Sequence, residues 1–128
     1  MRGLLLDTQA LLWLLGNNPR MGPAARAQVS AAPSVRYSAA SIWEIEIKRA
    51  SGKLQIERDL AAGLAASGLA ELPVTAAHAL GIGATELPHR DPFDRLLLTQ
   101  AVAEGLAFLT ADSILLSLAR SDIIDARS

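Results

Sequence analysis

Short apolar runs alternate with longer helical segments along almost the whole chain, and this alternation constrains the fold more than any other feature. The apolar runs are too short for helices and are typical of buried strands; they lie at residues 2–6, 34–38, 69–74 and 107–109. Residues 122–125 add a candidate edge strand. Strands separated by helices form a parallel sheet that is covered on both faces. The sequence therefore predicts an α/β fold, a three-layer α/β/α sandwich around a central, mostly parallel sheet.

The predicted helices are bounded by residues that commonly begin or end helices. Asp7 or Thr8 is a natural N-cap, and Gly52, Gly68 and Gly105 are natural terminators. The predicted helices span residues 8–15, 23–32, 39–50, 58–67, 76–83, 92–104 and 113–120, the last capped by Asp112, and residues 86–90 are predicted to form a loop.

Length and composition predict one cytoplasmic domain over residues 1–128. Half of the residues are hydrophobic (51%), which excludes a disordered chain. The absence of cysteine excludes disulfides, thiolate nucleophiles and cysteine-based zinc sites. No run reaches the ~20 apolar residues of a membrane span, and the apolar start is too short for a signal peptide.

Two acidic residues follow predicted strands, where ligands bind in open α/β sheets. Asp7 comes directly after the first strand, and Asp112 lies three residues beyond Leu109. If these strands are neighbours, both carboxylates enter one crevice. The alternative is that each residue only caps a helix, which contributes about 1 kcal/mol. For Asp112 this alternative is at least as strong, whereas Asp7 favours a functional role.

A second pair of acids opens the helix predicted at residues 92–104. Asp91 before Pro92 has the pattern of an N-cap. Asp94 precedes Leu97 and Leu98 by three and four residues, so it shares their inward face. A buried carboxylate costs several kcal/mol unless it is paired or coordinates a metal ion. We therefore assign the cap to Asp91 and a functional role to Asp94.

Glu44 is a weaker candidate when it is considered alone. Lys48 stands four residues later, so an ordinary surface ion pair of about 0.3–0.5 kcal/mol explains Glu44 without any function. Glu46 is a rival acid on the same predicted helix and points elsewhere.

Several acids that converge cannot all remain ionised without a compensating cation. Hard divalent ions such as Mg²⁺ or Mn²⁺ suit an all-carboxylate site and can activate water for phosphodiester hydrolysis. Thr8 and Thr110, beside two of the acids, could hold ligands or water in place. The acids expected to converge are Asp7, Glu44, Asp94 and Asp112, with Asp7, Asp94 and Asp112 as metal ligands.

Basic and imidazole residues give a weaker signal. A net charge of −1 lacks the basic excess typical of nucleic-acid binders, so any RNA contact depends on how the bases are arranged. Arg95 and Lys48 are the candidate phosphate contacts because they stand close to the acids. His78 is expected to serve packing or to lie at the surface, and His89 stands in the loop before Asp91.

Four motifs, in this order, resemble PIN-domain ribonucleases and are closest to VapC-type toxins of toxin–antitoxin modules. They are LLLDT at residues 4–8, SAASIWEI at 38–45, DPFDRLL at 91–97 and LTAD at 109–112. The resemblance implies an Mg²⁺- or Mn²⁺-dependent endoribonuclease that cleaves RNA, commonly dimerises and is inhibited by a cognate antitoxin. The acidic quartet of the family falls on the same four acids. Its accessory hydroxyl falls on Thr110, with Thr8 and Ser41 as supports.

The chain departs from the pattern at one position. The subgroup with this opening commonly has His where this sequence has Gln9, which cannot carry a positive charge. Gln9 and the near-neutral net charge favour a rival interpretation, a non-catalytic PIN-like module that binds RNA or a protein partner. The intact acidic quartet favours the nuclease.

Overall fold

The sheet has five parallel strands with β1 at its centre. In the computed structural model, which describes residues 2–56, 59–82 and 91–128, the strand order is β3-β2-β1-β4-β5. Every neighbouring pair is parallel. This confirms the predicted α/β class and leaves β5 as the expected edge strand. The strands are β1 (Leu4–Leu6), β2 (Val35–Ser38), β3 (Ala70–Leu72), β4 (Ala107–Thr110) and β5 (Ile123–Asp125).

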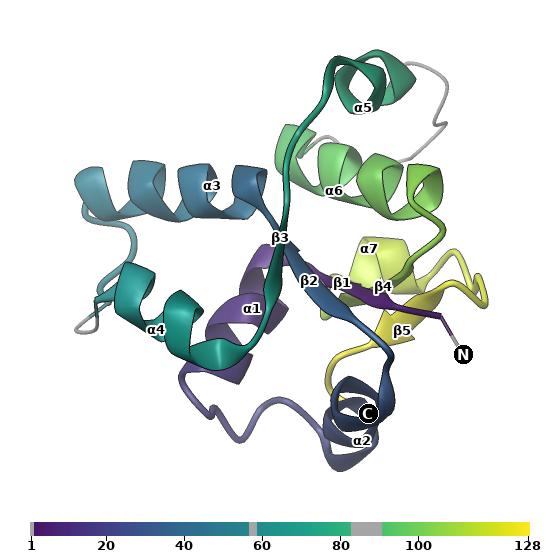
Figure 1. Cartoon of the computed structure of the whole chain (residues 1–128), viewed down its shortest axis with the longest axis horizontal. Coiled ribbons are helices and arrows are strands. Elements are labelled where there is room, and N and C mark those ends of the chain that lie inside the picture. Colours follow the sequence, from purple (N-terminus) through teal and green to yellow (C-terminus); the bar gives the residue numbers. More distant parts are fainter. Residues whose placement is uncertain (1, 57–58, 83–90) are drawn as a thin grey trace.

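Helices cover both faces of the sheet. Figure 1 shows α1, α2 and α4 on one side and α5, α6 and α7 on the other. Side chains of a strand alternate between faces, so Leu6 and Leu109 pack in one core cluster while Leu5 and Phe108 pack in the other. The three-layer arrangement follows from this two-sided burial. The helices are α1 (Thr8–Leu15), α2 (Pro23–Ala31), α3 (Ala39–Ala50), α4 (Leu60–Ser67), α5 (Ala76–Gly81), α6 (Pro92–Ala103) and α7 (Ser113–Leu116).

The last helix is shorter than the sequence predicts. We expected it to continue to about Arg120, but α7 ends at Leu116. The Ser117 hydroxyl donates to the carbonyl oxygen of Ile114, and Ala119 adopts a left-handed conformation with φ of 51°. These features turn the chain so that β5 can begin at Ile123. The prediction for α7 was therefore wrong in the length of the helix, although the predicted N-cap, Asp112, is correct.

Other boundaries differ by one or a few residues. Asp59 caps α4, its Oδ1 accepting the backbone N–H of Ala62, so this helix begins at Leu60. Gly68 ends it with φ of 76°. The predicted loop at residues 86–90, which includes His89, lies outside the described residues. No helix within the described ranges is long and apolar enough to cross a membrane.

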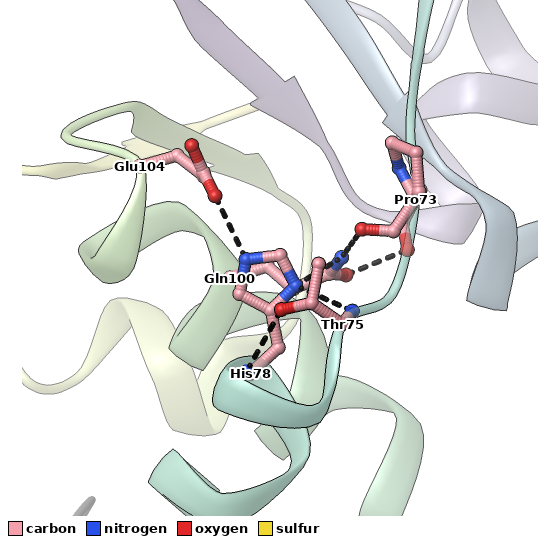
Figure 2. A network of polar contacts seen from close by, with 6 residues as sticks. Pro73, Thr75, His78, Gln100 and Glu104 are labelled. Atoms are coloured by element: carbon pink, nitrogen blue, oxygen red, sulfur yellow. Dashed lines mark hydrogen bonds and ion pairs between the residues drawn. The ribbon is translucent and has the colours of Figure 1, made fainter.

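A buried polar network holds α5 against α6 and the end of β3 (Figure 2). The Thr75 backbone N–H donates to Nδ1 of His78 at 3.1 Å, so the ring proton lies on Nε2, which donates to Glu104 at 2.8 Å. Gln100 donates to the carbonyl oxygen of Pro73 at 3.3 Å and accepts the Ser38 hydroxyl at 2.6 Å. His78 is thus a buried packing residue, one of the two roles expected for it.

Candidate active site

The candidate site lies where the strand order reverses, beyond the carboxyl ends of β1 and β4. Leu6 pairs with Leu109, and the backbone N–H of Asp7 donates to the Leu109 carbonyl oxygen at 2.9 Å. Asp7 therefore leaves β1 beside the point where the chain leaves β4 toward Asp112. In open α/β sheets this switch point is where ligands bind. The expectation that the two strands are neighbours is confirmed.

One pocket of about 270 Å³ brings all four predicted acids together. It opens at the carboxyl edge of the sheet and receives side chains from α1, α3 and α6 and from the segment after β4. The pocket is lined by Asp7, Thr8, Gln9, Leu12, Glu44, Lys48, Leu54, Asp91, Asp94, Ala111, Asp112 and Arg127. Residues that are far apart in the sequence thus form a single, strongly acidic surface, which we call the acidic pocket.

Asp7 is the most buried of these acids, at 4% exposure. Its Oδ1 accepts the backbone N–H of Ala10 at 2.7 Å as the N-cap of α1, and its Oδ2 accepts the Thr110 hydroxyl at 2.6 Å. Burial raises the pKa of Asp7 from 3.8 to about 6, even though these hydrogen bonds lower it. The nearby charge of Asp112 raises the pKa further. A negative charge on Asp7 is therefore costly unless a cation lies close by.

Thr110 connects two of the acids. While its hydroxyl donates to Asp7, its oxygen accepts the backbone N–H of Asp112 at 3.0 Å. Asp112 in turn caps α7, since its Oδ1 accepts from Ile114 N and Leu115 N at 2.9 and 3.0 Å. Asp112 thus both caps a helix and lines the acidic pocket. Thr110 is fully buried, and its hydroxyl group contacts both the Asp7 carboxylate and the Asp112 backbone.

Glu44 is buried, which corrects the surface interpretation that its sequence context favoured. Only 5% of the residue is exposed. Its Oε1 accepts the Thr8 hydroxyl at 2.6 Å, and its Oε2 pairs with the Lys48 ammonium at 2.7 Å. Ser41 Oγ lies 3.0 Å from Thr8 Oγ1, so Ser41 contacts Thr8, and Thr8 alone of the two predicted hydroxyl supports contacts this carboxylate. By contrast, Glu46 is exposed and pairs with Arg49, as expected of an acid that points elsewhere.

The acids of α6 divide their roles less sharply than predicted. Asp91 is the N-cap, with Oδ1 accepting the backbone N–H of Phe93 at 2.9 Å, yet it also lines the acidic pocket beside Asp94. Arg95 is not among the residues that line this pocket, and its Nε is buried without a hydrogen-bond partner among the described residues. Of the two predicted phosphate contacts, only Lys48 reaches the pocket.

The donor set has the chemistry of a site for a hard divalent cation, namely carboxylate and hydroxyl oxygens around one small cavity. Across the described ranges, however, no three acidic or imidazole side chains converge closely enough, as they stand, to hold a metal ion. Asp7, Glu44 and Asp112 each turn oxygens toward nearby N–H, hydroxyl or ammonium donors. A metal ion would share these oxygens with the donors, because each carboxylate oxygen can accept from more than one partner.

The sequence matches the PIN domain family over residues 4–121. This chain belongs to the PIN domain family. No curated protein matches it in sequence. The matched range contains all four predicted acids and ends just before β5, so the family assignment covers the pocket apart from Arg127.

Solved structures share the fold of this PIN domain at low sequence identity. A chain of the VapBC2 structure from Rickettsia felis, bound to a promoter DNA fragment, has a TM-score of 0.64 and 16% identity over 96% of both chains. A chain of a toxin–antitoxin complex from Klebsiella pneumoniae has a TM-score of 0.65 and 15% identity, and the match covers 94% of this chain and 95% of that one. A chain of a DNA-bound VapBC structure from Salmonella typhimurium has a TM-score of 0.60 and 20% identity, and the match covers 98% of this chain and 97% of that one.

Sequence reasoning missed Arg127 as a residue of the PIN-domain pocket. Its Nη1 donates to the carbonyl oxygen of Ala111 at 2.8 Å, directly beside Asp112. The signal was available in the topology. β5 is parallel to β4 with Thr110 opposite Asp125, so residues just after Asp125 emerge at the same edge as residues just after Thr110.

Proposed function

We propose that this PIN domain is a metal-dependent endoribonuclease, the toxin component of a toxin–antitoxin module. The observation that carries the proposal is the convergence of Asp7, Glu44, Asp94 and Asp112 on one pocket at the switch point of the sheet. Structural acids are normally dispersed over a protein surface, because like charges repel. Five carboxylates in one cavity outnumber the two cationic side chains that line it, and a bound metal ion would offset the remaining repulsion.

The bound ion, Mg²⁺ or Mn²⁺, would activate water and stabilise the developing charge on the phosphate. Asp7, Asp94 and Asp112 are the residues that would hold it. Glu44 is assigned as a further ligand or as the base that positions water. The Thr8 hydroxyl and the Lys48 ammonium fix its two oxygens.

Lys48 has a second assigned role. Its pKa is raised, chiefly by its hydrogen bond to Glu44, so it stays positively charged throughout the neutral range. An ammonium group at the rim of an acidic pocket offsets the repulsion between the carboxylates and an incoming phosphate. Lys48 thus both orients Glu44 and assists RNA binding.

The test is cleavage of a mixed RNA pool with Mn²⁺ or Mg²⁺, with a chelator and matched variants as controls. We expect Asp94→Asn and Glu44→Gln to lose cleavage, and Glu46→Gln, on the same helix but outside the pocket, to retain it. Cuts that persist in the chelator or in folded Asp94→Asn protein would refute the assignment. A folded wild-type protein that binds RNA but never cuts it would support the binding-module alternative instead.

The toxin role rests on the shared fold with chains of toxin–antitoxin complexes. We propose an antitoxin partner, action in the cytoplasm and a homodimer. Several large apolar side chains on the helices are exposed, including Trp43 at 65% and Leu80 at 83%, and an interface between two copies would cover them. Arrested growth on expression, relieved by a neighbouring small gene, is the expected phenotype. Light scattering of the purified chain tests the dimer.

A further inference from the structure

A second hollow lies directly beside the acidic pocket and has the opposite charge. It has a volume of about 400 Å³ and is lined by Gln9, Trp13, Arg20 and Arg127, and we call it the arginine hollow. Gln9 and Arg127 line both hollows, so the two cavities share a wall. The two charged residues that line the arginine hollow are both cations, whereas carboxylates dominate the lining of the acidic pocket.

The Arg127 side chain is held in place by neutral groups and not by an ion pair with a carboxylate of the described residues. Its Nη1 donates to the Ala111 carbonyl oxygen at 2.8 Å, and its Cζ lies 5.6 Å from the centre of the Trp13 ring. A hydrogen bond to a neutral carbonyl and a cation–π contact fix the plane of the guanidinium and leave its full positive charge. Such a preorganised group loses little conformational freedom when it binds an anion.

Neither arginine of the hollow forms an ion pair with any described carboxylate. The only hydrogen bond of Arg20 with described residues is made by its backbone N–H, which donates to Asn18. Other arginines of the chain are neutralised locally, as Arg49 is by Glu46 and Arg120 is by Asp122. Two guanidinium groups at one cavity repel each other, and an anion between them reduces that repulsion.

We propose that the arginine hollow binds a phosphate of the RNA backbone adjacent to the phosphate that is cleaved. This inference rests on the proposed ribonuclease function and specifies how its substrate is held. The acidic pocket repels a polyanion, so much of the binding energy has to come from cations close by. Arg20 and Arg127 supply two, and the Gln9 amide offers a neutral hydrogen-bond donor where the two hollows meet. A chain of net charge −1 can then bind RNA locally.

The experiment measures binding of a fluorescent single-stranded RNA over a series of salt concentrations, in the inactive Asp94→Asn background. We expect Arg20→Gln to weaken binding about tenfold, as loss of a charge-assisted contact does. The slope of log affinity against log salt should become shallower by about 0.7, the contribution of one phosphate contact on a single strand. Arg127→Gln should behave alike, while Arg127→Lys should keep the slope. Arg49→Gln, an exposed arginine elsewhere, is the matched control and should change neither quantity.

Arg20→Gln is the cleanest variant, because its side chain makes no hydrogen bond or ion pair with the described residues, and its melting temperature should equal that of the parent. A neutral methylphosphonate beside the cleavage site should weaken binding to the parent but not further weaken binding to Arg20→Gln. If the parent cleaves RNA and both arginine variants match Arg49→Gln, this inference is overturned and the ribonuclease stands; an acidic protein segment is then the better occupant. A wild-type chain that binds no RNA overturns both proposals.

Discussion

Replacing Asp7 with asparagine should abolish activity and at the same time stabilise the metal-free protein at neutral pH. Asp7 is buried, and its pKa rises from 3.8 to about 6 on folding. Between these two pH values the folded chain holds a proton that the unfolded chain has lost, so the free energy of unfolding of the wild type falls as pH rises. At about 1.4 kcal/mol for each pH unit, the loss amounts to about 3 kcal/mol at neutral pH.

The asparagine side chain of the Asp7→Asn variant avoids this cost because it never ionises. It keeps the N-cap of α1, since asparagine caps helices as well as aspartate does. Its amide nitrogen then faces Thr110, and rearranging that hydrogen bond costs about 1 kcal/mol. The net gain for Asp7→Asn is about 2 kcal/mol at neutral pH. For a domain of this size it corresponds to a melting temperature about 8 °C higher.

The assay is thermal unfolding in a chelator at about pH 4 and about pH 7. The Asp7→Asn variant should have the higher melting temperature at the higher pH but not at the lower one. Added Mg²⁺ or Mn²⁺ should then raise the melting temperature of the wild type more than that of the variant, since binding to the folded state is stabilising. A variant that is less stable than wild type at neutral pH, or a difference independent of pH, would refute the claim that Asp7 is a desolvated carboxylate.

Asp122 provides a control of opposite sign. The Arg120 side chain holds the pKa of Asp122 below its usual value through a hydrogen bond. The charge of Asp122 therefore stabilises the fold above its ordinary pKa, and this contribution is lost as pH falls through the lowered value. Asp122→Asn should be less stable than wild type at neutral pH, and the difference should shrink in acid.

Three further predictions test other contacts. Glu44→Gln should retain the fold but lose at least a hundredfold in cleavage rate, as expected for a positioned base, whereas Glu46→Gln should retain full rate in the same assay. Thr110→Val should lower the free energy of unfolding by about 1–3 kcal/mol, measured by chemical denaturation. The variant should also move the acidic limb of the pH–rate profile to higher pH, because the Thr110 hydrogen bond lowers the pKa of Asp7. An unchanged profile would contradict this. Gln100→Leu should cost about 2–3 kcal/mol by leaving the Ser38 hydroxyl without its acceptor, and an unchanged denaturation midpoint would argue against the buried network.

Much of the fold could be predicted because its local signals agree with its tertiary structure. The helices Thr8–Leu15 and Ala39–Ala50 begin and end where the sequence predicts. In both, a capping side chain starts the helix, and in α3 a left-handed Gly52 follows the end. The end of α7 could not be predicted in this way. There the chain must turn back to pair β5 with β4, and this tertiary demand overrides the helical preference of residues 117–120.

The site could be predicted where an acid follows a strand and less well where burial decides. Asp7 and Asp112 were placed by the rule for strand ends, which depends only on the order of elements. Glu44 resembled a surface residue because its partner Lys48 is adjacent on the helix, while its burial comes from the packing of α3 against α1 and the hydroxyl of Thr8. Arg127 reaches the pocket only through the register of β5 on β4.

Capping and the proposed function, which the sequence presents as competing explanations for the acids, are compatible in this pocket. Asp7, Asp91 and Asp112 each use Oδ1 to accept backbone N–H groups at the start of α1, α6 or α7. A side chain fixed in this way has a defined orientation before any ligand binds, so little rotamer entropy remains to be lost. The caps also place carboxylates at helix N-termini, where negative charge is favoured. A helix cap at the end of a parallel strand therefore holds an acid at the pocket at no cost to the helix, and stability suffers chiefly at Asp7, where burial is nearly complete.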